Sequence, residues 1–247
     1  MGVPLEEFDE DEPVLRPSPL EVDGRFPEAA VMCFFPEAIA ELQRTGALVR
    51  IGAFSAELGG MSVFATPDRS VAVFHPGVGG PLSAHCFEKA IASGVTRAIA
   101  VGGAGAIAPG FEKDDVLVVS AALRDEGASF HYVPASRVLR FDETEVRRLV
   151  DGLGAADIPA RAGVTWTTDA DYRETRARVA RRRAEGCVAV EMEAASLAAV
   201  AQFRGVRYGH VLYSGDDLTG ETWAERGWTT SGRRTTLLGT TMDLAAR

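Results

Sequence analysis

The chain has 247 residues, of which 46% are hydrophobic and 25% are charged, and its formal net charge is -9. This length suits one full-sized domain, and the composition excludes a disordered or collagen-like chain. The negative charge repels nucleic acids and anionic membranes, so neither is an expected partner. No apolar run approaches the roughly 18 residues of a membrane span. Residues 5–12 are acidic where a signal peptide would be basic and then apolar, so we expect a cytoplasmic protein.

Cysteines and histidines give no sign of a disulfide framework or a metal site. Cys33, Cys86 and Cys187 are far apart in the sequence, without a CxxC pair, and the four histidines include no i, i+4 pair. We therefore expect buried free thiols and no bound metal.

Residues 1–27 combine many acids with prolines, a composition that resists both helix and strand. We expect this segment to be an N-terminal arm. Residues 28–247 are predicted to form a single domain, because no linker or internal repeat divides them.

Strands and helices alternate along the predicted domain. Apolar runs predict strands at 29–35, 61–66, 71–75, 98–101, 116–123, 164–167, 187–190 and 206–213. Helical spacing predicts helices at 37–44, 82–92, 143–153, 172–184 and 191–203, and one more within 237–246. This alternation is typical of an α/β sandwich with a mainly parallel or mixed sheet.

Two further patterns have ordinary explanations. Gly103, Gly105 and Ala108 fit a dinucleotide-binding GxGxxA turn, but Pro109 and Gly110 break the chain where that motif needs a helix. The chain also has one dense basic run, which we interpret as a solvated helix face. Its members are Arg176, Arg178, Arg181, Arg182 and Arg183.

Carboxylates follow two of the predicted strands. Glu191, Met192 and Glu193 open a helix of small residues, and Asp216 and Asp217 come soon after the apolar run 206–213. Ligands bind at the carboxyl ends of strands in open α/β sheets. Acids are also common at helix N-termini without any role in binding, so the pattern alone leaves both interpretations open.

The order of four motifs resembles the purine nucleoside phosphorylase and uridine phosphorylase superfamily, which includes nucleosidases. The motifs occupy residues 75–81, 101–107, 190–194 and 214–217, and residues 124–132 resemble the uridine phosphorylase branch. The resemblance spans about residues 29–215. It implies a three-layer α/β/α sandwich with a mixed central sheet that cleaves the N-glycosidic bond of a nucleoside. It further implies a homo-oligomer and no cofactor, with phosphate as a possible co-substrate.

The resemblance also assigns roles to the acids. Glu193 would bind the ribose hydroxyls, with Met192 packed on the sugar and Glu191 beside them. Asp216, or as second choice Asp217, would protonate or hydrogen-bond N7 of a purine-like base, because uridine-specific members lack this acid. We expect the remaining substrate contacts from the second glycine motif and from the wall of the base pocket. These residues are Gly103, Ala104, Gly105, Trp166, Thr168 and Tyr172.

The chain departs from the family where phosphate would bind. A G-D-P-x-R turn is replaced by residues 34–38, and an expected arginine and hydroxyl residue are replaced by Ala100 and Gly103. Phosphate recognition needs cationic forks and donors, which these positions do not offer. We therefore expect water to attack the sugar, with Glu37 as the candidate base that activates it.

Three alternatives stay open. A phosphorylase could use a rebuilt anion site, in which Arg44 or Arg50 compensates from an altered loop or from a neighbouring subunit. A non-catalytic sensor could bind a nucleoside through Glu193 without cleaving it. A biosynthetic enzyme could act on a modified or C-linked nucleoside, which the unusual base-pocket stretch would suit.

Overall fold

The computed structural model describes residues 3–11, 13–55, 60–226 and 231–247. Its strands are Ala29–Cys33 (β1), Val49–Phe54 (β2), Met61–Ala65 (β3), Val71–Phe74 (β4), Arg97–Ala106 (β5), Val116–Asp125 (β6), Val138–Arg140 (β7), Ala160–Thr168 (β8), Cys187–Glu191 (β9), Arg207–Asp217 (β10) and Ala224–Glu225 (β11). Its helices are Pro36–Arg44 (α1), Gly80–Ala92 (α2), Glu143–Ala155 (α3), Arg176–Ala184 (α4), Ala194–Arg204 (α5) and Ser231–Ala246 (α6). Short 3-10 turns occur at Pro4–Glu6 (η1), Ala128–His131 (η2) and Asp171–Arg173 (η3).

The strands of the described residues form one sheet, in the order β11-β10-β6-β8-β9-β5-β1-β4-β3-β2, with β7 on the side of β6. Strand β5 also pairs with β10, so β5, β10, β6, β8 and β9 close into a ring. Pairs such as β1 with β5 are parallel, whereas β5 with β9 is antiparallel. The predicted mixed central sheet is confirmed.

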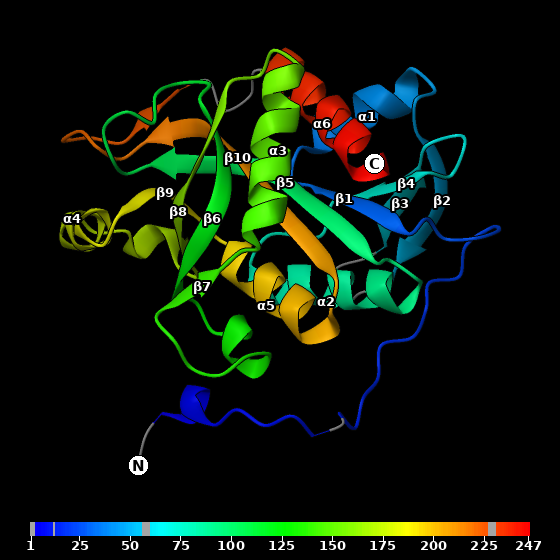
Figure 1. Cartoon of the computed structure of the whole chain (residues 1–247), viewed down its shortest axis with the longest axis horizontal. Helices are drawn as coiled ribbons and strands as arrows, with labels where there is room; N and C mark the ends of the chain where they lie inside the picture. The colour runs from blue at the N-terminus through cyan, green and yellow to red at the C-terminus, as the bar shows by residue number, and fades with distance from the viewer. Residues whose placement is uncertain (1–2, 12, 56–59, 227–230) are drawn as a thin grey trace.

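Helices cover both faces of the sheet (Figure 1). Helices α2 and α5 pack together on one face, while α1, α3 and α6 contact one another on the other. Helix α5 can approach both α2 and the sheet because much of its sequence is alanine, whose small side chain leaves room for neighbouring backbone. The predicted three-layer α/β/α sandwich is therefore confirmed.

Two predicted strand ends need correction. Strand β5 does not stop at Val101 for a glycine turn but continues through the glycines to Ala106, because β9 and β10 bind its last residues from both sides. Strand β10 likewise runs through Asp216 and Asp217, which therefore lie inside the strand. The glycines serve close strand packing here: a Cβ on Gly105 would lie 2.5 Å from Cδ1 of Leu218.

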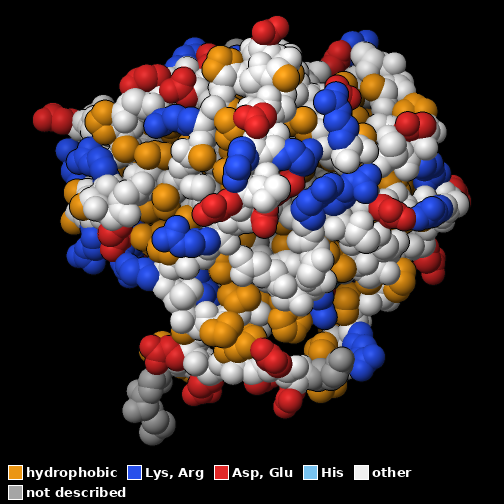
Figure 2. All heavy atoms as spheres, viewed as in Figure 1, with side chains coloured by type: hydrophobic (Ala, Val, Ile, Leu, Met, Phe, Trp, Pro, Cys, Tyr) orange, Lys and Arg blue, Asp and Glu red, His pale blue; other side chains and the backbone are white. Residues whose placement is uncertain are grey.

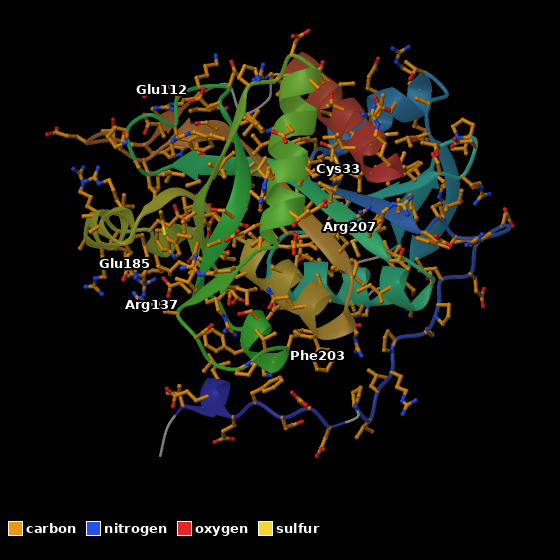
Figure 3. All side chains as sticks on the ribbon, viewed as in Figure 1. Cys33, Glu112, Arg137, Glu185, Phe203 and Arg207 are labelled. Carbon is orange, nitrogen blue, oxygen red and sulfur yellow. The ribbon has the colours of Figure 1, made fainter. Side chains whose placement is uncertain are left out.

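Other differences concern short or edge elements. Strands β2, β7 and β11 are not predicted by the sequence pattern. Helix α4 begins at Arg176, so Tyr172 lies in the separate turn η3, and α5 begins at Ala194, after the acidic motif. The three cysteines are buried and free, as predicted, and Figure 3 labels Cys33 among them.

The arginines of the basic helix α4 face solvent, with one exception. Arg182 is buried and pairs with Asp125 and Glu185, each at 2.9 Å. Glu185 also binds Arg137, and Figure 3 shows these two residues side by side between α4 and β7. The predicted solvated face thus applies to the other arginines of the run, and Arg182 instead fixes α4 to β6.

The N-terminal arm runs along the lower edge of the molecule (Figure 1). It is attached near its end, where the backbone N–H of Leu20 donates to Oγ of Ser93 at 2.8 Å. Further towards the N-terminus the arm stands away from the body, and Figure 2 shows the resulting hollow. This hollow of about 950 Å³ is lined on the body side by residues that include Tyr132 and Phe203.

No helix of the described residues is long and apolar enough to cross a membrane.

A matched pair of glycine substitutions tests the packing of α2 against α5. A Cβ on Gly80 would lie 2.3 Å from Oγ of Ser196, whereas Gly154 in α3 has open space around it. We expect Gly80→Ala to lower the free energy of unfolding by about 1–3 kcal/mol through overpacking. Gly154→Ala should raise it by about 0.5–1 kcal/mol by restricting the unfolded chain. Urea denaturation measures both; equal effects of the two substitutions would contradict the close contact.

Candidate active site

The carboxylate of Glu193 lies where α2 and α5 begin. Its Oε1 accepts the backbone N–H of Gly79 at 2.5 Å, and the residue is only 7% exposed. Gly79 caps α2 with φ of 91°, a left-handed conformation that favours glycine. The glycine motif and the acidic motif, far apart in sequence, therefore meet at one hydrogen bond, which we call the Gly79–Glu193 clamp.

Glu191 organises the turn that presents Glu193. Its Oε2 accepts the backbone N–H groups of Glu193 and Ala194, each at 2.7 Å, and its Oε1 accepts the hydroxyl of Thr167 at 2.6 Å. Both of its oxygens are thus used inside the protein. Glu191 thereby holds the start of α5, next to half-buried Met192, and its predicted contact with substrate stays a prediction.

The two carboxyl groups hold protons unusually strongly. Burial raises the pKa of Glu191 to about 7, although its hydrogen bonds oppose this rise. Burial, and then the charge of Glu191, raises the pKa of Glu193 to about 8. A hydroxyl group that donates to Glu193 would favour its ionised form, so the binding of such a ligand would be coupled to the release of a proton.

The two neighbouring aspartates have different environments. Asp216 accepts Nε1–H of Trp223 on Oδ2 at 2.7 Å, while its Oδ1 is buried with no hydrogen-bond partner in the described part of the chain. Burial, together with the charge of Asp217, raises the pKa of Asp216. Despite its own partial burial, Asp217 has a lowered pKa because it accepts the backbone N–H of Thr219 at 2.7 Å and pairs with Arg226. Of the two candidates, Asp216 is the better proton donor.

Gly105 is where the two halves of the site meet. It pairs with Val190 of β9 on one side and with Asp216 of β10 on the other. A Cβ on Gly105 would lie 3.1 Å from Cγ1 of Val190 and 3.2 Å from Oδ1 of Asp216. Only Gly105 thus separates the end of β9, which leads to Glu193, from Asp216 of β10. Gly103 and Ala104 precede it in β5, opposite the β10 residues just before Asp216.

The residues predicted for the base pocket do not form one wall. Trp166 is fully buried, and its Nε1–H donates to Asp125 at 3.0 Å. Thr168 is also buried, and its Oγ1 accepts the backbone N–H of Ala170 at 3.2 Å. Tyr172, by contrast, is 95% exposed. Trp166 and Tyr172 therefore do not line a common wall.

Glu174 is an acid that sequence reasoning missed. It lies directly after η3 and is half-buried. Burial, and then the charges of Asp216 and Asp171, raises its pKa to about 7. Arg176 donates to the backbone carbonyl of Glu221, which joins this segment to the one that carries Trp223. The burial of Glu174 and its closeness to Asp216 arise from segments that are distant in sequence, so no motif predicts them.

Glu37 is held by the far end of the chain. Its Oε1 pairs with Nη1 of Arg234 in α6 at 2.5 Å, and Nε of Arg234 donates to the hydroxyl of Tyr213 at 2.8 Å. The guanidinium also lies over the rings of Phe35 and Tyr213. Glu37 is therefore oriented by a buried cation. The sequence does not predict this pair, because Arg234 is far from Glu37 along the chain.

Phe34 stands at the position where the resemblance leads us to expect a glycine. Phe34 packs edge-on against His75, at 5.6 Å between ring centroids, and parallel to His210 at 6.4 Å. A Cβ on Gly102 would lie 3.2 Å from the Phe34 ring, so the ring covers the strand next to Ala100 and Gly103. Burial lowers the pKa of His75 and lowers that of His210 to about 3. Both imidazoles are neutral at pH 7, and this region gains no positive charge from them.

The other candidate cations are already bound elsewhere. Arg44 pairs with Glu41 on the exposed face of α1, and Nε of Arg50 donates to Oγ of Ser62 at 3.3 Å. Among the residues that the structure describes, no three His, Cys, Asp or Glu side chains form a group that could hold a metal ion.

Residues 28–238 match the family model of the phosphorylase superfamily. The chain belongs to this superfamily. The resemblance predicted from the four motifs is thereby confirmed, and members of this family are enzymes.

Two curated relatives illustrate the range of the family. The uridine phosphorylase of Salmonella typhimurium is 30% identical over 157 residues, which cover 58% of this chain and 62% of that protein. The guanosine phosphorylase of Halorubrum lacusprofundi is 29% identical over 135 residues, 55% of this chain and 56% of that protein. The chain thus spans about three-fifths of the length of the curated relatives that it matches.

A solved structure supports the fold over nearly the whole chain. The purine nucleoside phosphorylase of Toxoplasma gondii, in complex with immucillin-H, superposes with a TM-score of 0.72. The superposition covers 90% of each chain at 18% sequence identity, a level at which it supports the fold alone.

The raised pKa values of Glu191 and Glu193 predict how stability changes with pH. Both pKa values lie above the ordinary 4.5, so the folded state binds more protons than the unfolded state between about pH 5 and 8. The free energy of unfolding should therefore fall as pH rises through this window, and fall less in Glu191→Gln. Urea denaturation at several pH values measures both slopes; identical slopes in the two proteins would refute the assignment.

Proposed function

We propose that this chain cleaves the N-glycosidic bond of a nucleoside with a purine-like base, and that water is the attacking group. The observation that carries the proposal is that Gly105 pairs with Asp216 of β10 on one side and with Val190 of β9, the strand that leads to Glu193, on the other. Asp216 has a raised pKa and a buried, unpartnered oxygen there, and β9 leads from the same point to Glu193 in the Gly79–Glu193 clamp.

The two acids suit the two halves of the reaction. As the bond between C1' and the base nitrogen breaks, its electron pair moves to the base, and a proton from Asp216 to N7 neutralises the leaving group. The sugar becomes positively charged in the same step. The carboxylate of Glu193, bound to the ribose hydroxyls, stabilises this charge and fixes the sugar in place.

Local chemistry supports water rather than phosphate. The four positions that would hold phosphate carry Phe34, Ala38, Ala100 and Gly103, which offer no cationic side chain. The ring of Phe34, packed against two neutral imidazoles, makes this region apolar. Glu37 remains our candidate for the base that activates water, with Arg234 fixing one of its oxygens.

Phosphorolysis is the second candidate. The relatives named above are phosphorylases, so they do not support hydrolysis. The buried guanidinium of Arg234, next to Glu37, is a cation that could attract an anion.

Base release from a panel of purine and pyrimidine nucleosides, with and without phosphate, tests the attacking group. We expect release of a purine-like base without phosphate, and free sugar as the product on chromatography. Formation of sugar 1-phosphate only when phosphate is present would replace hydrolysis by phosphorolysis. Tight binding without cleavage of any nucleoside would instead indicate a sensor.

Matched substitutions test which aspartate protonates the base. Asp216→Asn keeps the size of the side chain but cannot supply a proton, so kcat should fall by about 10²–10⁴-fold. Asp217→Asn should reduce kcat less than tenfold while lowering thermal stability, because it weakens the pair with Arg226. Kinetics on a nucleoside with a purine-like base, alongside melting temperatures, distinguish the two; the opposite order of losses would move the role to Asp217.

A further inference from the structure

Glu126 is a buried carboxylate that the proposed reaction leaves without a role. It lies directly after β6, within the motif at residues 124–132, and is 5% exposed. Its Oε2 accepts the backbone N–H of Ser129 at 2.9 Å and the hydroxyl of Ser196 at 2.5 Å. Its Oε1 accepts the hydroxyl of Ser129. Donors from η2 and α5 thus surround this carboxylate.

Ser196 connects Glu126 to the Gly79–Glu193 clamp. It stands one turn after Glu193 on α5, and its Oγ would lie 2.3 Å from a Cβ on Gly80. Gly79, the residue before, donates its N–H to Glu193. The contacts therefore form a closed circuit. Glu126 binds Ser196, and Ser196 packs against the start of α2. The N–H of Gly79 at that start donates to Glu193, which lies three residues before Ser196 at the N-terminus of α5.

A guanidinium fixes the outer side of this circuit. Nε of Arg124 donates to Oγ of Ser129 at 2.8 Å, and its Nη1 donates to Oγ of Ser136 and to the carbonyl of Pro134, each at 2.8 Å. The hydroxyl of Ser129 therefore stands between the cation and the carboxylate of Glu126. This arrangement ties η2 and the following loop to β6.

The charge of Glu126 also acts on the clamp. It is one cause of the raised pKa of Glu191 and of Asp169, and the charges of Glu191 and Asp169 in turn raise the pKa of Glu193. Charged and titratable groups from three elements face the Glu191–Glu193 pair. They are Glu126 after β6, with Arg124 next to it, Asp169 after β8, and Tyr208 in β10.

We propose that Glu126 is a positioning residue for nucleoside binding, which holds Ser196 and the start of α5 so that the carboxylate of Glu193 stays against Gly79. This inference rests on the proposed function, in which Glu193 binds ribose. It also has a consequence that needs no turnover, since removing the charge of Glu126 should let the Glu191–Glu193 pair ionise at lower pH.

A titration followed by NMR tests that consequence. The protein is labelled with [δ-13C]glutamate. Glu191→Gln and Glu193→Gln identify the signals of these two residues among those that titrate near pH 7–8, and Glu174→Gln identifies the third. In Glu126→Gln we expect the midpoints of Glu191 and Glu193 to fall by about one pH unit, the effect of removing one charge nearby. Ser196→Ala keeps the charge and should shift them less. Glu143→Gln, an exposed substitution on α3, is the matched control and should shift neither.

Kinetics on the nucleoside that the wild-type protein cleaves best tests the positioning. We expect Glu126→Gln and Ser196→Ala each to raise KM about tenfold with a smaller change in kcat, because sugar binding depends on the clamp. Glu143→Gln should leave both constants unchanged. Unchanged midpoints and KM, with only a lower melting temperature, would reduce Glu126 to a purely structural residue. If the wild-type protein cleaves no nucleoside, the proposed function fails, while the titration alone still decides the inference: lowered midpoints support it and unchanged midpoints overturn it.

Discussion

Burial of negative charge at the start of α5 is the constraint on which the site depends. An ionised carboxylate taken out of water costs several kcal/mol unless donors replace the water. Glu126, Glu191 and Glu193 are almost fully buried, and backbone N–H groups and hydroxyls supply those donors. The glycines follow from this need, because Gly79 must turn its N–H towards Glu193 and Gly80 must leave room for the hydroxyl of α5.

Much of this arrangement could be predicted from the sequence, because the decisive signals are local. Apolar runs identified the central strands, and the small residues of α5 indicated a closely packed helix after the acidic motif. The glycines of β5 misled the prediction, since glycine usually marks a turn in a single sequence. Here Gly105 instead lets β9 and β10 approach from both sides, a condition set by strands that are distant in sequence.

The residues that sequence reasoning missed act through long-range contacts. Arg234 reaches Glu37 across 197 positions, and Glu126 reaches Ser196 across 70. Neither pair has a spacing that a periodic pattern can reveal. The choice between Asp216 and Asp217 also depends on contacts that the sequence does not reveal. Residues on either side of β11 bind the two aspartates: Trp223 binds Asp216, and Arg226 binds Asp217.

The same electrostatic constraint bears on the attacking group. In the proposed reaction, a phosphate ion would approach Glu193, whose carboxyl group is ionised when it binds the sugar, in a chain whose net charge is already -9. Repulsion between like charges grows as water is excluded, so an anion needs cations at close range to enter. Phe34 and two neutral imidazoles occupy the region where the family would place them. A neutral water molecule meets no such barrier, which is the physical reason for proposing hydrolysis while keeping the proposed roles of Glu193 and Asp216.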